Sequence, residues 1–296
     1  MEIGQVIKYI RTNKKITQQE LATAIGMTRP YIARIESGKN SISSDKLTEI
    51  LEYCNVTYNE FFYIKNDYTK SSKMNEFNRV IELYYANDME EISKIKNRVN
   101  EQYKKNGDIF LRHLYILCHC IENDLDSSKV KDEYIKEITD YLLSMDEWCY
   151  HELAIMNNFI LLFPPETAFL MTKNLLNRAD KYKGLNLDKN MLSYIFFNLL
   201  ECSFKYEGYQ YSKIVLDATK KYYKKVSDFF EQTLIIYYEG MLDIVENSIP
   251  QGKEKCNRAF TIFHTLGHES IYQKYKADLE ELLKKVENKN SITEEV

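Results

Sequence analysis

The first 63 residues contain five short runs in which apolar residues recur at the three- and four-residue spacing of an amphipathic helix. The first run has Ile3, Val6, Ile7 and Ile10, and its helix is predicted to end near Asn13. The other four runs have inward-facing apolar residues at Leu21, Ala22 and Ile25, at Ile32 and Ile35, at Leu47, Ile50 and Leu51, and at Phe61 and Phe62. The pattern therefore predicts five short helices around one small core.

Polar residues before these runs mark where the helices begin. Segments 17–20 and 57–60 both have the form Thr-x-x-Glu, a capping box in which the threonine hydroxyl and the glutamate carboxylate each accept a backbone N–H. Thr28 is expected to cap the third helix, with Pro30 in its first turn, where the missing N–H costs little. The remaining expected boundaries are turns at Gly26 and Gly38 and a helix start at Ser43.

Two short helices joined by a glycine turn, with three supporting helices, are typical of a helix-turn-helix unit. The segment TQQELATAIGMTRPYIARIESGK resembles the helix-turn-helix family of phage lambda-type repressors, also called the XRE family. The resemblance rests on the combination of Gln18, Glu20, Leu21, Ala22, Gly26, Ile32, Ile35, Glu36 and Gly38. It implies a DNA-binding domain over residues 1–64.

In that family the N-terminal half of the third helix lies in the major groove of DNA. The DNA-binding residues implied for this chain are Gln18, Thr28, Arg29, Pro30, Tyr31, Arg34, Lys39 and Asn40. An arginine suits guanine because its planar fork can donate to both N7 and O6. Arg29 and Arg34 are therefore candidates for base contacts, the alternative being ordinary solvated charges.

The other candidates have different implied roles. Gln18 matches a phosphate-binding position at the start of the second helix, and Lys39 and Asn40 are placed to meet phosphate after the third helix. Pro30 either touches a thymine methyl group or only shapes the helix start, and Tyr31 either packs or contacts a phosphate. A further pair, Arg11 and Glu36, resembles the family's structural ion pair between the first and third helices and is not assigned to DNA contact.

Helical patterning continues after a short polar segment, residues 65–74, which we interpret as a linker. Expected helix starts recur about every 40 residues, near Asp108, Trp148, Asp188, Asp228 and His268. A partner set begins near Met89, Val130, Thr167, Tyr209 and Pro250. Breaks fall between these starts, among them Asp126-Ser127-Ser128 and Gly184. This recurrence predicts an all-α chain whose residues 75–287 form a TPR-like α-solenoid, followed by a polar tail at 288–296.

A stack of helix pairs has a concave face lined by one helix of each pair. Asn158 and Asn198 occupy equivalent positions of neighbouring repeats and would both point into that face if the register holds. An asparagine amide has both donors and acceptors, so two of them could hold the backbone of an extended peptide. Alternatively, both amides satisfy neighbouring helices. The 24 tyrosines leave the same choice between a peptide groove and packing.

Composition supports these expectations. Only 9 Gly and 4 Pro occur, too few for the tight turns of a β-rich protein. Residues 1–65 have 9 Lys/Arg against 7 Asp/Glu, a net charge of +2, and the remainder has 31 against 37, a net charge of −6. A slightly basic head on an acidic body suits a DNA regulator. The absence of a signal peptide and of an 18-residue apolar run favours the cytoplasm, and six scattered cysteines without CxxC favour reduced thiols.

The whole arrangement resembles the Rgg/GadR/MutR regulators. The resemblance rests on the XRE-type head, the repeats from about residue 75, and the segments DEWCYHELAIMNN and FNLLECSF. It implies a homodimer that binds promoter DNA and a repeat domain that binds a short hydrophobic signalling peptide, as in quorum sensing. The implied peptide-binding residues are Asn158 and Asn198, with Arg112 and Asn157 as weaker candidates. Some members use a cysteine in the head for redox sensing, but Cys54 matches no such position.

No catalytic set is recognisable. His151-Glu152 begins like the HExxH motif of a metallopeptidase, but Ile155 stands where the second histidine belongs. The other histidines are isolated along the chain, and there is no Walker or dinucleotide-binding glycine motif. We therefore expect neither an enzyme, nor a metal, nor a cofactor. The main alternative to a peptide-responsive regulator is a constitutive repressor whose repeats serve only dimerisation or bind another protein.

Overall fold

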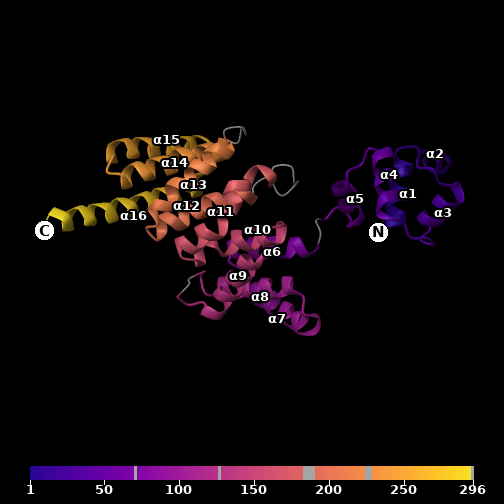
Figure 1. Ribbon diagram of the computed structural model, residues 1–296, viewed down its shortest axis with the longest axis horizontal. Helices are drawn as coiled ribbons and strands as arrows, with labels where there is room; N and C mark the ends of the chain where they lie inside the picture. Colours follow the sequence, from indigo (N-terminus) through magenta and orange to yellow (C-terminus); the bar gives the residue numbers. More distant parts are fainter. Residues whose placement is uncertain (70–71, 126–127, 183–190, 224–228, 295–296) are drawn as a thin grey trace. The chain divides into compact units, whose positions relative to one another are not determined.

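The computed structural model describes residues 1–69, 72–125, 128–182, 191–223 and 229–294, and every regular element in these ranges is a helix (Figure 1). The predicted all-α class is confirmed. The chain divides into two compact units, Met1–Asp88 and Met89–Val296. None of the described helices is both long enough and apolar enough to span a membrane.

The first unit contains the five short helices that the apolar pattern predicts, and a sixth. Their bounds are α1 Ile3–Asn13, α2 Gln18–Ala24, α3 Arg29–Glu36, α4 Ser44–Tyr53, α5 Tyr58–Lys65 and α6 Ser72–Tyr85. Both predicted capping boxes are present, at Thr17 before α2 and at Thr57 before α5. The expectation for Thr28 was wrong in one respect: its backbone occupies the N-cap of α3, but its side chain makes no capping hydrogen bond.

The core of the first unit fixes α3 against α1. Ile32 and Ile35 of α3 are buried with Val6, Ile7 and Ile10 of α1. At Gly4 the two backbones approach so closely that an added Cβ atom would lie 1.9 Å from the carbonyl oxygen of Ile35. The helix that carries the DNA-contact candidates is therefore held by direct backbone contact as well as by apolar side chains.

The second unit is a succession of helix pairs. Their bounds are α7 Met89–Asn106, α8 Ile109–Glu122, α9 Asp132–Ser144, α10 Tyr150–Phe159, η1 Ile160–Leu162, α11 Pro165–Tyr182, α12 Met191–Lys205, α13 Tyr209–Tyr223, α14 Phe229–Val245, α15 Ile249–Thr265 and α16 Glu269–Glu294. They follow one another through the unit in chain order (Figure 1). The even-numbered helices α8 to α16 begin about 40 residues apart, as the sequence pattern predicts.

Some of the predicted helix starts and breaks lie at or beyond the ends of the described ranges. The starts expected at Asp188 and Asp228, and the breaks at Gly184 and at Asp126-Ser127, lie outside the described residues, whereas α12 and α14 are described from Met191 and Phe229. Within the segment interpreted as a linker, α5 ends at Lys65 and α6 begins at Ser72. The segment interpreted as a polar tail is helical as far as Glu294.

Two glycines allow α14 and α15 to cross with their backbones in close contact. An added Cβ atom at Gly240 of α14 would lie 2.6 Å from the carbonyl oxygen of Gly252 in α15, and one at Gly252 would lie 2.5 Å from the carbonyl oxygen of Gly240. The buried thiol of Cys256 lies beside this crossing. Helices α14 and α15 therefore pack backbone to backbone, which fixes the end of the stack.

Candidate functional site

Two arginines lie on the exposed half of α3. Arg29 and Arg34 are both exposed, and neither guanidinium has a hydrogen bond or ion pair within the described residues. Pro30 lies in the first turn beside Arg29 and is also exposed. Tyr31 is partly buried and packs against the core, which favours the packing interpretation of this residue. The guanidinium groups of Arg29 and Arg34 can therefore donate hydrogen bonds to a ligand at the exposed face of α3.

The other end of α3 is fixed by a buried carboxylate. Glu36 is 5% exposed and accepts hydrogen bonds from Arg11, from Nε at 2.6 Å and from Nη2 at 3.0 Å. Arg11 Nη1 also donates to the carbonyl of Ile16 at 2.6 Å. The bond to Glu36 raises the pKa of Arg11, so this guanidinium stays charged. The structural ion pair expected between the first and third helices is therefore present.

Gln18 belongs to the same network. Its Nε2 donates to Glu36 Oε2 at 2.8 Å, which links the first turn of α2 to the end of α3. Gln18 was expected to contact phosphate, and this contact to Glu36 was missed. The amide still has a second N–H and a carbonyl oxygen for another partner. After α3, Gly38 has a φ of 74°, and the exposed Lys39 follows it. Lys39 therefore lies on the loop after α3, where its contact with phosphate was expected.

In the second unit two asparagines meet between α10 and α12. Asn198 Nδ2 donates to Asn157 Oδ1 at 3.0 Å and approaches the Asn157 carbonyl at 3.4 Å. Asn158 instead donates to the carbonyl of Ala154 in its own helix at 2.7 Å. The structure therefore brings Asn157, one of the weaker candidates, into contact with Asn198. All three side chains remain partly exposed.

Arg112, the weaker peptide-binding candidate, is engaged within the protein. Its Nε and Nη2 donate to Glu137 at 2.8 and 2.6 Å, which joins α8 to α9. Its guanidinium also lies 5.2 Å from the centre of the Tyr134 ring. A bidentate pair with an aromatic neighbour is a structural contact, so Arg112 would have to exchange partners to hold a ligand.

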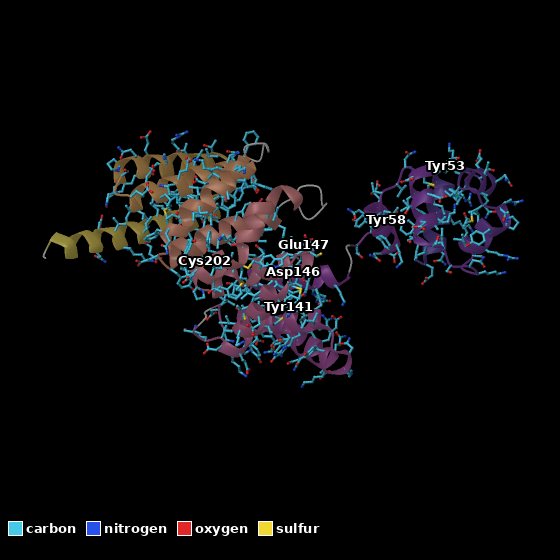
Figure 2. The ribbon with its side chains drawn as sticks, viewed as in Figure 1. Tyr53, Tyr58, Tyr141, Asp146, Glu147 and Cys202 are labelled. Atoms are coloured by element: carbon cyan, nitrogen blue, oxygen red, sulfur yellow. The ribbon has the colours of Figure 1, made fainter. Side chains whose placement is uncertain are left out.

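Two histidines that are far apart along the chain meet in the fold. His113 of α8 and His151 of α10 meet with Nδ1 and Nε2 3.0 Å apart, although 38 residues separate them. His113 is completely buried, its Nε2 has no hydrogen-bond partner among the described residues, and its ring lies 4.5 Å from that of Tyr141. Tyr141, labelled in Figure 2, donates to Glu152 at 2.6 Å. Burial and the neighbouring His151 lower the pKa of His113 to about 4, so it is uncharged at neutral pH.

Within the described residues no three His, Cys, Asp or Glu side chains converge as metal ligands would. The cysteines show no disulfide, and five of the six are buried. Burial raises the pKa of the Cys54 thiol, which makes it less reactive than an exposed cysteine. Cys54 is therefore a packed core residue of the first unit.

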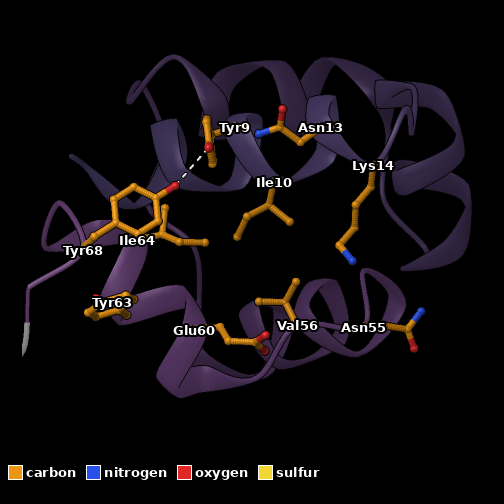
Figure 3. A pocket seen from close by; sticks show the side chains of 10 residues that line it. All are labelled: Tyr9, Ile10, Asn13, Lys14, Asn55, Val56, Glu60, Tyr63, Ile64 and Tyr68. Carbon is orange, nitrogen blue, oxygen red and sulfur yellow. Dashed lines mark hydrogen bonds between the residues drawn. The ribbon is translucent and has the colours of Figure 1, made fainter.

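The first unit also has an apolar surface pocket of about 360 Å³ between α1 and α5 (Figure 3). The hydroxyls of Tyr9 and Tyr68 lie 2.9 Å apart at one side of it, and Tyr63 and Lys14 line other parts. Asp67 and Tyr68 both have positive φ angles, 52° and 61°, and the segment after α5 thereby turns back to α1. None of the DNA-contact candidates lines this pocket, so it is separate from the α3 surface.

A helix-turn-helix unit with two free arginines on its third helix, joined to a stack of helix pairs, defines a DNA-binding regulator. Residues 96–277 match the family model described as "HTH-type transcriptional regulator Rgg, C-terminal domain", and residues 7–61 match a helix-turn-helix model. The first match covers more than half of the chain, and the chain belongs to the Rgg family of transcriptional regulators. The expectation of a regulator rather than an enzyme is thereby confirmed.

Solved structures agree over nearly the whole length. A protein from Listeria monocytogenes EGD-e is 26% identical, with a TM-score of 0.81 over 96% of this chain and 97% of that one. The SHP pheromone receptor Rgg2 of Streptococcus dysgalactiae is 23% identical, with a TM-score of 0.75 over 96% and 100% of the two chains. PlcR of Bacillus thuringiensis, solved with the peptide PapR7 and DNA, is 18% identical, with a TM-score of 0.56 over 91% and 98%. The last two likenesses show a shared fold.

A curated relative matches only in the head. The antitoxin PezA of Streptococcus pneumoniae is 36% identical over 56 residues, which is 19% of this chain. The match spans 35% of the length of PezA, about a third of that protein. It supports the helix-turn-helix assignment and extends no further along the chain.

Proposed function

We propose that this regulator binds promoter DNA as a homodimer through α3 and that a short hydrophobic peptide, bound by the second unit in the cytoplasm, controls its activity. The observation that carries the DNA part is the pair of unpartnered arginines on the exposed half of α3. The peptide part draws support from the fold, which is shared with a pheromone receptor and with a regulator solved with peptide and DNA. A ligand shifts such an equilibrium only by its different affinity for the two states of the regulator.

In this proposal Arg29 and Arg34 contact base edges. Thr28, Gln18, Lys39 and Asn40 contact phosphates, and Pro30 and Tyr31 shape the contact surface. Two neighbouring phosphate-binding elements, the start of α2 and the loop after α3, would set the register of α3 on the duplex. Dimer symmetry predicts a site made of two inverted half-sites.

The test of the DNA contacts is binding to a library in which each base pair of the site is varied. Arg29→Ala and Arg34→Ala should each weaken binding by about 1–3 kcal/mol and relax the preference at one base pair. Arg29→Lys and Arg34→Lys are matched controls because they keep the charge but lose the fork. If the alanine variants instead lose affinity equally on all sequences and the lysine variants restore it, the arginines contact only phosphate.

The peptide-binding residues proposed here are Asn158 and Asn198, with Asn157 and Arg112 as further candidates. The contact with Asn198 strengthens the case for Asn157, because Asn157 only accepts in it and its own amide N–H donors remain for a ligand. The alternative is a constitutive repressor whose second unit only dimerises. Synthetic peptides from short reading frames beside the gene should change DNA binding by the native chain. Asn198→Ala should abolish that response while the dimer, measured by sedimentation, stays intact; loss of the dimer instead supports the alternative.

A further inference from the structure

A second pocket lies between α12, α14 and α16. Its volume is about 280 Å³, and all three helices belong to the set that begins about every 40 residues. One wall is apolar, made by Phe204, Tyr238 and Met241, which are almost completely buried. Glu201 on its rim follows Asn198 by one turn of α12, so the pocket continues the face on which that asparagine lies.

Two of the three carboxylates at this pocket have an ion-pair partner, and the third does not. Glu201 is paired with Lys274 at 2.8 Å, and Glu281 is paired with Lys285 at 2.7 Å. Asp278 lines the same pocket, yet within the described residues it has neither an ion pair nor a hydrogen bond. The phenol of Tyr237, which also lines the pocket, donates to the carbonyl of Tyr275 at 3.0 Å and not to Asp278.

The environment of Asp278 disfavours its charge. Partial burial and, to a lesser extent, the nearby Glu201 raise the pKa of this carboxyl to about 6, while Lys274 opposes the shift. A half-buried carboxylate without a counter-charge is stabilised by any cation that enters. The other unpaired charge of the pocket, Lys205, is exposed and therefore solvated, with its ammonium 5.2 Å from the Tyr206 ring centre.

We propose that this pocket binds a protonated alkylamine or a guanidinium, with Asp278 as its counter-ion and the wall of Phe204, Tyr238 and Met241 against its apolar stem. A lysine or arginine side chain has this chemistry, and so has a free polyamine. We assign the cation to a basic side chain of the bound peptide, an assignment that rests on the function proposed above. The pocket would then select peptides that have one basic residue among apolar ones.

The test uses the native full-length chain labelled with ¹³C at its methionine methyl groups, with the Met241 signal assigned from Met241→Leu. n-Hexylammonium should shift this signal saturably and bind at least about tenfold more tightly than 1-hexanol, which has the same stem without the charge. Asp278→Asn should remove that difference, whereas Glu280→Gln, an exposed neighbour on α16, should leave it unchanged. In the native chain the preference should grow from pH 5 to pH 7 as Asp278 ionises, which tests the idea without any substitution.

Several results would overturn the proposal. Three results would each show that the Asp278 carboxylate does not bind the cation. They are equal affinity for hexylammonium and hexanol, no shift of the Met241 signal with either compound, and an unchanged preference for hexylammonium in Asp278→Asn. Tighter binding of the diamine cadaverine than of hexylammonium would overturn the assignment to a peptide side chain and identify a free polyamine. Because the signal of Met241 is independent of DNA, this test can fail or succeed separately from the function proposed above.

Discussion

The network around Glu36 gives the sharpest prediction for the first unit. Replacing Glu36 by alanine removes the acceptor of three hydrogen bonds, two from Arg11 and one from Gln18. The Arg11 side chain is only 12% exposed, so its guanidinium would stay largely buried without a counter-ion. One bond of Arg11 survives, to the carbonyl of Ile16. The C-terminal end of α3 would lose its polar link to both α1 and α2.

The expected cost follows from this burial. Removing one partner of a buried ion pair costs about 3–5 kcal/mol, because the remaining charge is desolvated and unpaired. The surviving Ile16 bond and the residual exposure of Arg11 place our expectation at the lower end, about 3 kcal/mol. Substituting both partners, Arg11→Met with Glu36→Leu, removes the buried charge and should recover most of that loss.

Amide hydrogen exchange of α3 in the full chain measures this cost locally. Glu36→Ala should lower the opening free energy of the protected α3 amides by about 3 kcal/mol and weaken DNA binding although Arg29 and Arg34 are unchanged. The double variant should exchange nearly like the native protein. A loss below about 1 kcal/mol in Glu36→Ala would refute the reasoning, since it would mean that water already solvates Arg11.

Further predictions concern close packing and pH. Gly4→Ala places a Cβ atom 1.9 Å from the Ile35 carbonyl oxygen and should destabilise the first unit by about 1–3 kcal/mol in the same exchange experiment; native exchange rates would contradict this contact. Gly252→Ala should lower the melting temperature of the second unit, followed by the fluorescence of its single tryptophan, Trp148, and an unchanged melting curve would exclude the backbone contact with Gly240. The folded protein lowers the pKa of His113 to about 4, so the unfolded chain takes up the proton first as the pH falls. Stability from this group should be fully present above pH 6.5 and be lost between pH 6.5 and pH 4, by about 3 kcal/mol in urea unfolding. His113→Phe should flatten this dependence and His264→Gln, which is exposed, should not; equal slopes in both variants would show that other groups cause it.

Much of the fold could be predicted because local signals mark where helices begin. The boxes at Thr17 and Thr57 place α2 and α5 to the residue, and the recurrence of about 40 residues places the starts of α8 and α16 within one residue. These signals depend on neighbours in sequence. They are therefore readable without knowing how the helices pack.

Side-chain contacts between helices were harder to predict, because they depend on the rotation of each helix about its axis as well as on where the helix begins. A step of one residue turns a side chain by about 100° around its helix, which is why Asn157 rather than Asn158 meets Asn198. The pair of His113 and His151 was missed although its 38-residue separation is close to one repeat, and that spacing was the available signal. Gln18 has a partner in Glu36 that the pattern of α2 alone does not indicate.

The most direct test of the central claim is genome-wide binding in vitro, with the purified full-length chain and fragmented DNA from its own source. We predict a small number of sharply enriched sites, each with two inverted half-sites whose centres are separated by whole helical turns of about 10 base pairs. Arg29→Ala combined with Arg34→Ala should erase the enrichment while the protein stays folded. Absence of enrichment over bulk DNA in the native protein, or the same enriched sites in the double variant, would contradict the assignment of α3 as the DNA-contacting helix.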